Sequence, residues 1–134
     1  AGGIMNGRAI RAMLEAGAAA VQLGTAFLAC PEAGTPKAHK DALLTSMTER
    51  TAITTAFSGR PARGMVNRFM LETAGEEPPA PFPVLTAMTR GLRGQAAKTG
   101  NIDFMSLWAG QGAPLTRALP AGELVQVLIE EMEG

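Results

Sequence analysis

Two glycine turns within the first 25 residues constrain the fold more than any other feature of the chain. Gly2-Gly3 stands directly before the stretch at 6–17, NGRAIRAMLEAG. The short apolar run at 19–23 then ends at Gly24-Thr25. A turn, a helix and a short buried strand, followed by another turn, is the order typical of a parallel α/β fold.

The stretch at 6–17 has the pattern of a one-faced amphipathic helix. Apolar residues at Ile10, Met13 and Leu14 recur three and four positions apart, which is the helical spacing. Asn6 is a suitable N-cap and Gly17 a suitable C′ residue. The run at 19–23 is bounded by glycines, so we expect a strand that is buried on both faces.

The rest of the chain is divided into short elements, because Gly and Pro together contribute 25 of the 134 residues. We expect a helix from Pro36 with Thr35 as its cap. The patterns further predict a strand at 51–57, an arginine-containing turn at 58–64, a helix at 65–72, a proline-rich linker at 75–83, a helix at 84–98, an irregular segment at 101–114 and an amphipathic helix at 121–133 with Leu124, Val125, Leu128, Ile129 and Met132 on one face.

Composition limits the class of protein. The formal net charge is zero, so nothing in the charge indicates a nucleic-acid or anionic-membrane partner. No apolar run reaches the length of a membrane span. The single cysteine, Cys30, cannot form an internal disulfide and predicts a reducing compartment, the cytoplasm. No cluster of His, Cys and carboxylates has metal-ligand spacing.

The two glycine turns together suggest a phosphate site. Amide N–H groups at glycine turns and helix N-termini carry partial positive charge, and glycine lets an anion approach the backbone closely. If the two turns follow adjacent parallel strands, they lie at the same end of the sheet, and Thr25 could add a hydroxyl donor. Glycine turns without a ligand are also common in α/β proteins, so spacing alone leaves the site open.

Longer sequence motifs point to a family. The segment AGGIMNGRAIRAMLEAGAAAVQLGTAFLACPEA, followed by FSGRPARGMVNRF and LWAGQG, closely resembles the C-terminal part of nitronate monooxygenases, formerly called 2-nitropropane dioxygenases. The resemblance covers essentially the whole chain. It implies an FMN-dependent (β/α)8 TIM barrel that oxidises alkyl nitronates with molecular oxygen. Flavin-dependent enoyl-ACP reductases are more distant relatives on the same barrel.

The resemblance also implies residue roles. In this family the loop after strand 7 and the turn after strand 8 hold the FMN phosphate, which corresponds here to Gly2, Gly3, Gln22, Leu23, Gly24 and Thr25. The WAGQG segment returns toward the flavin and the substrate pocket, so Trp108, Gly110 and Gln111 are candidate lining residues. The family's catalytic histidine lies on an earlier part of the barrel, and no residue of this chain matches it.

The same resemblance divides the chain into three regions. Residues 1–30 correspond to the last barrel βα units with the phosphate-binding turns. Residues 31–100 form a mainly helical inserted region, whose part up to about 75 sits over the barrel mouth. Residues 101–134 return to the flavin pocket and end in the last barrel helix.

A TIM barrel takes roughly 250 residues, so the resemblance implies an incomplete barrel, and the glycine turn at the start of the chain also suggests a cut within a larger fold. We expect no nitronate oxidation by the chain alone. Uncovered strand edges and apolar helix faces predict self-association.

Two other functions remain open. One is an NAD(P)H-dependent flavin reductase of the enoyl-ACP reductase type, and the other is a non-catalytic helical binding or assembly module. Retention of FMN by the isolated chain would argue against the non-catalytic module.

The remaining reactive side chains have ordinary interpretations. We expect His39 on a solvated helix face and Cys30 as a buried, inert thiol. Arg60, Arg63 and Arg68 could steer an anionic ligand or pair with carboxylates such as Glu72, Glu76 and Glu77.

Overall fold

A computed structural model describes residues 1–134 and shows a mainly helical chain with one small sheet. The helices are α1 (Gly7–Glu15), α2 (Thr25–Leu28), α3 (Lys37–Leu43), α4 (Arg68–Glu72), α5 (Val84–Met88), α6 (Arg90–Thr99) and α7 (Ala121–Glu133), and the strands are β1 (Thr51–Thr54) and β2 (Ala62–Met65). Three 3-10 turns complete the elements: η1 (Ser46–Glu49), η2 (Ile102–Phe104) and η3 (Ala113–Leu115).

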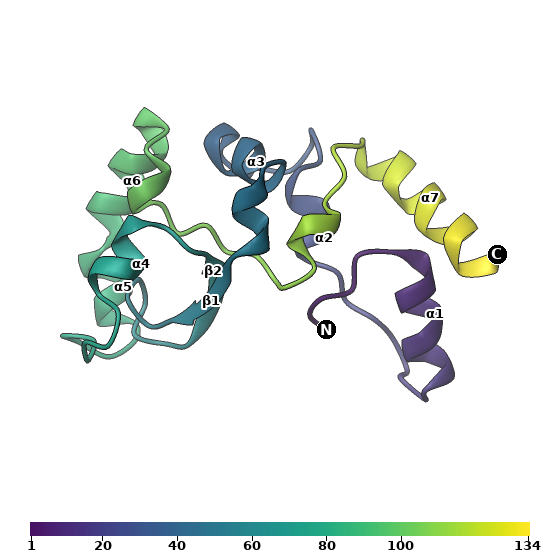
Figure 1. Ribbon diagram of the computed structural model, residues 1–134, viewed down its shortest axis with the longest axis horizontal. Coiled ribbons are helices and arrows are strands. Elements are labelled where there is room, and N and C mark those ends of the chain that lie inside the picture. The colour runs from purple at the N-terminus through teal and green to yellow at the C-terminus, as the bar shows by residue number, and fades with distance from the viewer.

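The N-terminal and C-terminal helices pack against each other at one end of the molecule, whereas α4, α5 and α6 lie at the other end (Figure 1). Gly7 makes the close approach of α1 and α7 possible, because a Cβ at this position would lie 2.1 Å from the carbonyl oxygen of Leu128. As predicted, Asn6 caps α1, with its side chain accepting from the amide of Ala9, and Gly17 follows the helix with φ +97°.

The small sheet is an antiparallel hairpin in which β1 pairs with β2. The predicted strand at 51–57 is therefore confirmed over its first four residues, but the predicted turn at 58–64 is wrong from Ala62 onward. A third segment extends the pairing through an antiparallel bridge between Gly64 and Trp108. Pairing on two sides explains how the sequence ARGM, which lacks a strand-like pattern, adopts extended structure.

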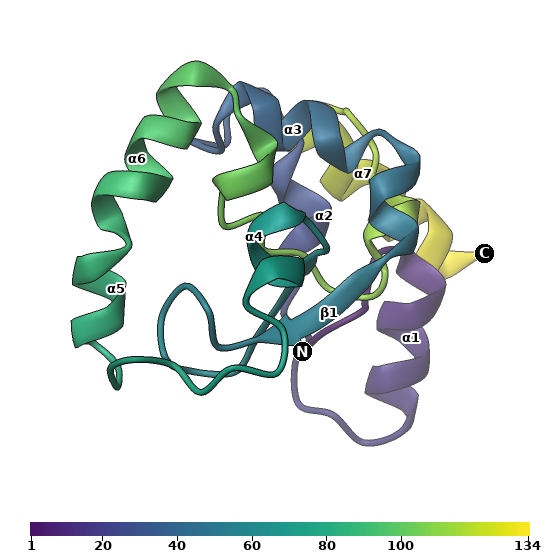
Figure 2. The ribbon, with the colours of Figure 1, turned by 60° about the vertical axis from the view of Figure 1, so that its left-hand side comes forward.

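Three helix boundaries differ from the sequence prediction. The helix expected at 65–72 begins only at Arg68, because Asn67 caps it by accepting from the amide of Met70. The helix expected at 84–98 is observed as α5 and α6, which meet at Thr89 (Figure 2). Thr35 does not cap α3, whose N-cap position is taken by Pro36 without a side-chain hydrogen bond.

The expected buried strand at 19–23 is not formed. The backbone of these residues makes no backbone hydrogen bond, and none of them is buried. The physical reason is that a strand exists only with a neighbour, and the one sheet of these 134 residues lies elsewhere in the chain.

Two separate apolar clusters form the core. The larger contains Ala42, Leu43, Met65, Ala96, Met105, Leu107, Ala109 and Ala113. The smaller contains Met5, Ala26, Cys30, Leu124 and Leu128, and it joins the segment before α1 to α2 and α7. Only part of the predicted apolar face of α7 is buried, since Val125 and Ile129 stay 41% and 38% exposed. None of the helices has the length and apolar character that a membrane span requires.

Candidate phosphate site

Three segments that are far apart in sequence enclose a cavity of about 290 Å³. We call it the glycine cavity. Its lining residues are Ala1, Gly2, Gly3, Ile4, Met5, Gln22, Gly24, Thr25, Gly110 and Gly112. The two glycine turns singled out in the sequence therefore lie beside one another, and a third glycine-containing segment, from the WAGQG stretch, joins them.

Free backbone donors characterise this cavity. The amides of Gly3, Gly24 and Thr25 donate to no acceptor within the chain. Gly2 and Gly3 have φ angles of +96° and +72°, a conformation in which a side chain would be strained, and no atom lies within 4 Å of an added Cβ at either position or at Gly24. The lining contains no carboxylate. Unpaired amides in the lining of a cavity that carries no carboxylate fit a phosphate group.

Thr25 connects the second glycine turn to the third segment. Its Oγ1 accepts a hydrogen bond from the amide of Gly110 at 2.9 Å. Because that bond uses a lone pair of the hydroxyl oxygen, the hydroxyl proton remains available to a further acceptor. A Cβ at Gly110 would lie 3.6 Å from the nitrogen of Gly3, so all three segments meet here.

The N-terminus of α1 does not contribute to the cavity. The amide of Ala9 donates to Asn6, and the amide of Gly7 donates to Oε2 of Glu131 at 2.9 Å. Two of the first three amides of α1 are thus used by α7 and by the cap, and no residue of α1 lines the cavity, so the donors in the cavity come from the glycine turns themselves.

The structure places five of the six predicted phosphate-binding residues in the glycine cavity: Gly2, Gly3, Gln22, Gly24 and Thr25. Leu23 does not line it and instead packs against the smaller apolar cluster. Gly112, which the sequence reading missed, also lines it and closely approaches Gly3, because an added Cβ would lie 2.8 Å from the Gly3 carbonyl oxygen. The repeated glycine of the WAGQG stretch was the signal for this residue.

The residues predicted to line the substrate pocket are separated. Gly110 lies in the glycine cavity, whereas Trp108 and Gln111 do not. Trp108 packs edge-on against Phe57, with ring centroids 5.4 Å apart, and bridges to Gly64 in the extended sheet. Gln111 is exposed.

His39 is buried, so its expected position on a solvated face is wrong. Its side chain lies on the inner face of α3 and is only 6% exposed, and its Nε2 has no hydrogen-bond partner. Burial lowers the pKa of His39, and the carbonyl of Trp108 opposes this shift only in part. The ring is therefore held neutral near pH 7.

Cys30 is a free thiol that is 1% exposed within the smaller apolar cluster. Burial, followed by the nearby charge of Glu32, raises the pKa of this thiol. A buried thiol with a raised pKa is a poor nucleophile.

The three arginines of the central region do not form one cationic patch. Arg68 pairs with Glu72 at 2.6 Å, as one sequence reading suggested. Arg63 instead donates to the carbonyl and hydroxyl oxygens of Thr51, and Arg60 stacks over the ring of Phe82. No group of three or more His, Cys, Asp and Glu side chains in the structure could hold a metal ion.

Comparison with known proteins assigns this architecture to a family. The sequence profile described as nitronate monooxygenase matches residues 1–131. The chain belongs to the nitronate monooxygenase family. It is 50% identical over its whole length to a nitronate monooxygenase of Pseudomonas aeruginosa, covering 39% of that protein. It is 43% identical over 99% of its length to a nitronate monooxygenase of Paraburkholderia phytofirmans, covering 37% of that protein.

Solved structures agree with this family membership. A nitroalkane oxidase of Streptomyces ansochromogenes superposes with a TM-score of 0.94 at 52% identity, over 98% of this chain and 38% of that one. FabK from Thermotoga maritima superposes with a TM-score of 0.76 at 28% identity, over 98% of this chain and 42% of that one. The chain thus spans about two fifths of the length of the proteins it matches.

Proposed function

We propose that the glycine cavity holds the phosphate of FMN in a flavin-dependent nitronate monooxygenase of which this chain is the C-terminal part. The observation that carries the proposal is the meeting of three glycine segments around unpaired amides, in a chain of the nitronate monooxygenase family. The absence of a carboxylate from the lining favours an anion. A dianionic phosphate supplies the acceptors that these amides lack.

In this proposal the amides of Gly3, Gly24 and Thr25 donate to phosphate oxygens. The Thr25 hydroxyl gives a further donor while its oxygen keeps the Gly110 amide in place. Bound flavin supplies the oxidising chemistry, with molecular oxygen as the final electron acceptor and an alkyl nitronate as substrate. The chain's own contribution is to bind and orient the cofactor's phosphate end.

The exposed apolar surface favours a larger assembly. Met13 and Leu14 on α1 are 43% and 40% exposed, and Val125 and Ile129 on α7 form a second apolar pair. We propose that further βα units of a (β/α)8 barrel cover these faces and pair with the segment at 19–23. We further propose that the complete enzyme is cytoplasmic. The separate chain is then inactive and self-associates through the same uncovered surfaces.

Oxygen consumption with an alkyl nitronate tests the activity in the full-length protein loaded with FMN. We expect turnover by the full-length protein and none by residues 1–134 alone with added FMN. Absence of turnover in the full-length protein, together with rapid flavin reduction by NADH or NADPH, would contradict the proposal and favour a reductase. Turnover by residues 1–134 alone would contradict the incomplete-barrel account.

A further inference from the structure

An ion pair ties the segment that precedes α1 to the last turns of α7. Arg117 Nη1 lies 2.8 Å from Oε1 of Glu131. Its Nη2 donates to the carbonyl oxygen of Met5 at 2.8 Å. The second carboxylate oxygen of Glu131 accepts from the amide of Gly7 at 2.9 Å. Two side chains from the C-terminal region thus hold backbone groups on both sides of Asn6.

These contacts act on the strand of chain that leads into the glycine cavity. Met5 lines the cavity, is 3% exposed and follows Gly3 by two residues. Arg117 and Glu131 do not line the cavity and lie beside a separate pocket of about 370 Å³ on the other side of Met5. The pair therefore does not contact a ligand in the glycine cavity, and its hydrogen bonds act on the backbone that leads into the glycine turn.

Arg117 compensates an unfavourable charge at the end of α7. α7 ends with Glu130, Glu131 and Glu133 and has no basic residue in its last turn, which is unfavourable next to a helix C-terminus. Of these, Glu131 alone is paired with a cation. The hydrogen bond from Arg117, and next that from the amide of Gly7, lower the pKa of Glu131. The pair is half-buried, with side-chain exposures of 28% and 33%.

We propose that Arg117 and Glu131 are positioning residues that hold the Gly2-Gly3 turn in the conformation that receives the FMN phosphate. This inference rests on the proposed function. A turn that is fixed before binding does not have to be ordered by the ligand, so its amides bind a phosphate more tightly. Ligands without a phosphate do not use these amides and are insensitive to the pair.

The test compares FMN with riboflavin, which lacks the phosphate, by flavin fluorescence titration of the full-length apoprotein. We expect the wild type to bind FMN about 100-fold or more tightly, because several charge-assisted hydrogen bonds go to the phosphate. Arg117→Ala is expected to raise the FMN Kd by about tenfold. Its riboflavin Kd should stay within about twofold of the wild-type value, since that ligand does not contact the turn.

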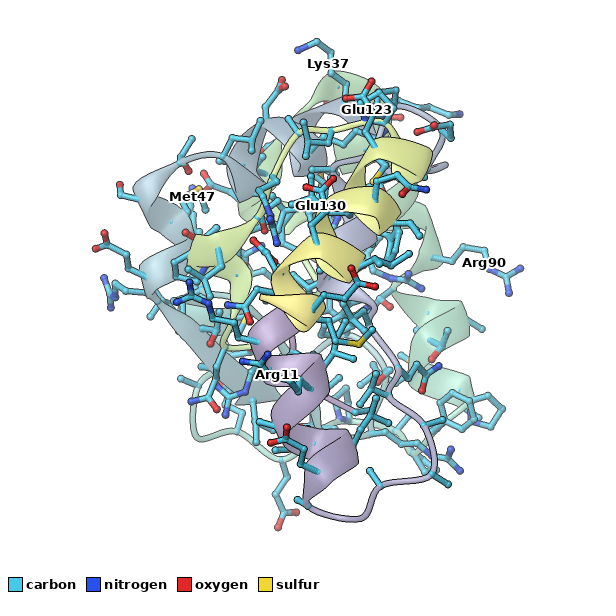
Figure 3. All side chains as sticks on the ribbon, turned by 90° about the vertical axis from the view of Figure 1, so that its right-hand side faces the viewer. Arg11, Lys37, Met47, Arg90, Glu123 and Glu130 are labelled. Carbon is cyan, nitrogen blue, oxygen red and sulfur yellow. The ribbon has the colours of Figure 1, made fainter.

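Arg11→Ala is the matched control. Arg11, labelled on α1 in Figure 3, also joins α1 to α7, because it donates to the carbonyl of Met132 at 3.1 Å. It makes no hydrogen bond or ion pair with residues 1–5. It should leave both flavin affinities within about twofold of wild type. If Arg117→Ala fails to fold, Arg117→Lys takes its place, because lysine keeps the charge but lacks the fork that reaches both Glu131 and Met5.

The outcomes separate this inference from the proposed function. If wild-type protein binds FMN and riboflavin equally, the phosphate assignment of the glycine cavity is wrong. If wild type prefers FMN and both Arg117 variants keep that preference, the phosphate site stands and the positioning role is wrong. The positioning role is also wrong if Arg11→Ala lowers the preference as much as Arg117→Ala, since the effect then comes from general α1–α7 packing.

Discussion

Replacement of Thr25 by valine should weaken FMN binding through loss of two hydrogen bonds. The variant keeps the branched shape at Cβ but removes the oxygen that accepts from the amide of Gly110 at 2.9 Å. It also removes the hydroxyl proton that we assign to the phosphate. Thr25→Ser retains the hydroxyl and is the matched control.

The expected magnitudes follow from the chemistry of each bond. Loss of the bond to Gly110 leaves a half-buried amide unpaired, which costs about 1 kcal/mol of folding free energy. In a protein of this size class that corresponds to a Tm lowered by about 2 °C. A hydrogen bond to a charged acceptor contributes about 1.5–3 kcal/mol, so the FMN Kd should rise about 10- to 100-fold.

The assay is a titration of full-length apoprotein with FMN and with riboflavin, together with a thermal denaturation curve. Thr25→Val should weaken FMN binding and leave riboflavin binding nearly unchanged. Thr25→Ser should resemble wild type in all three measurements. Unchanged FMN affinity in Thr25→Val, or an equal loss for both flavins, would refute the assignment of this hydroxyl to the phosphate.

Three further variants test the packing and the buried polar groups by urea denaturation. Gly7→Ala should lower the free energy of unfolding by about 3 kcal/mol or more, because the added Cβ would overlap the carbonyl oxygen of Leu128. A decrease of less than about 0.5 kcal/mol would show that α1 and α7 are not in close contact. Asn67→Asp removes the side-chain amide that donates to two carbonyl oxygens of the 102–105 turn, both at 2.8 Å. The free energy of unfolding should fall by about 3 kcal/mol at neutral pH and by less at acidic pH, where the carboxyl group is protonated. Wild-type stability of this variant would contradict the importance of these two hydrogen bonds. The pKa of His39 is lower in the folded protein than in the unfolded chain, so the unfolded chain takes up a proton at a higher pH and the free energy of unfolding falls as the pH drops below 6.5. His39→Gln should remove that part of the pH dependence, and an unaltered pH profile of stability would contradict the lowered pKa of His39.

Local signals allowed the sequence to predict α1 well. The cap at Asn6, the glycine at 17 and the helical spacing between them depend only on neighbouring residues. The two glycine turns were also recognisable, because glycine pairs at such junctions are local features. Their meeting in one cavity was inferred from the expected parallel strands, yet the structure brings them together without a strand at 19–23.

Features that depend on distant partners were not predictable from local patterns. β2 is extended because β1 and the segment at Trp108 pair with it on two sides. The Arg117–Glu131 contacts with residues 5–7 join positions more than a hundred residues apart, and no spacing rule connects them. His39 was expected on a solvated face, but it is buried, because which face of α3 is covered depends on the segments that pack against it and not on the sequence of the helix.

The most direct measurement is a crystal structure of the full-length protein with FMN bound. We predict phosphate oxygens within about 3 Å of the amide nitrogens of both Gly3 and Gly24, with the Thr25 hydroxyl as a third donor. A phosphate bound elsewhere, or one that only one of the two glycine turns can reach, would contradict the account.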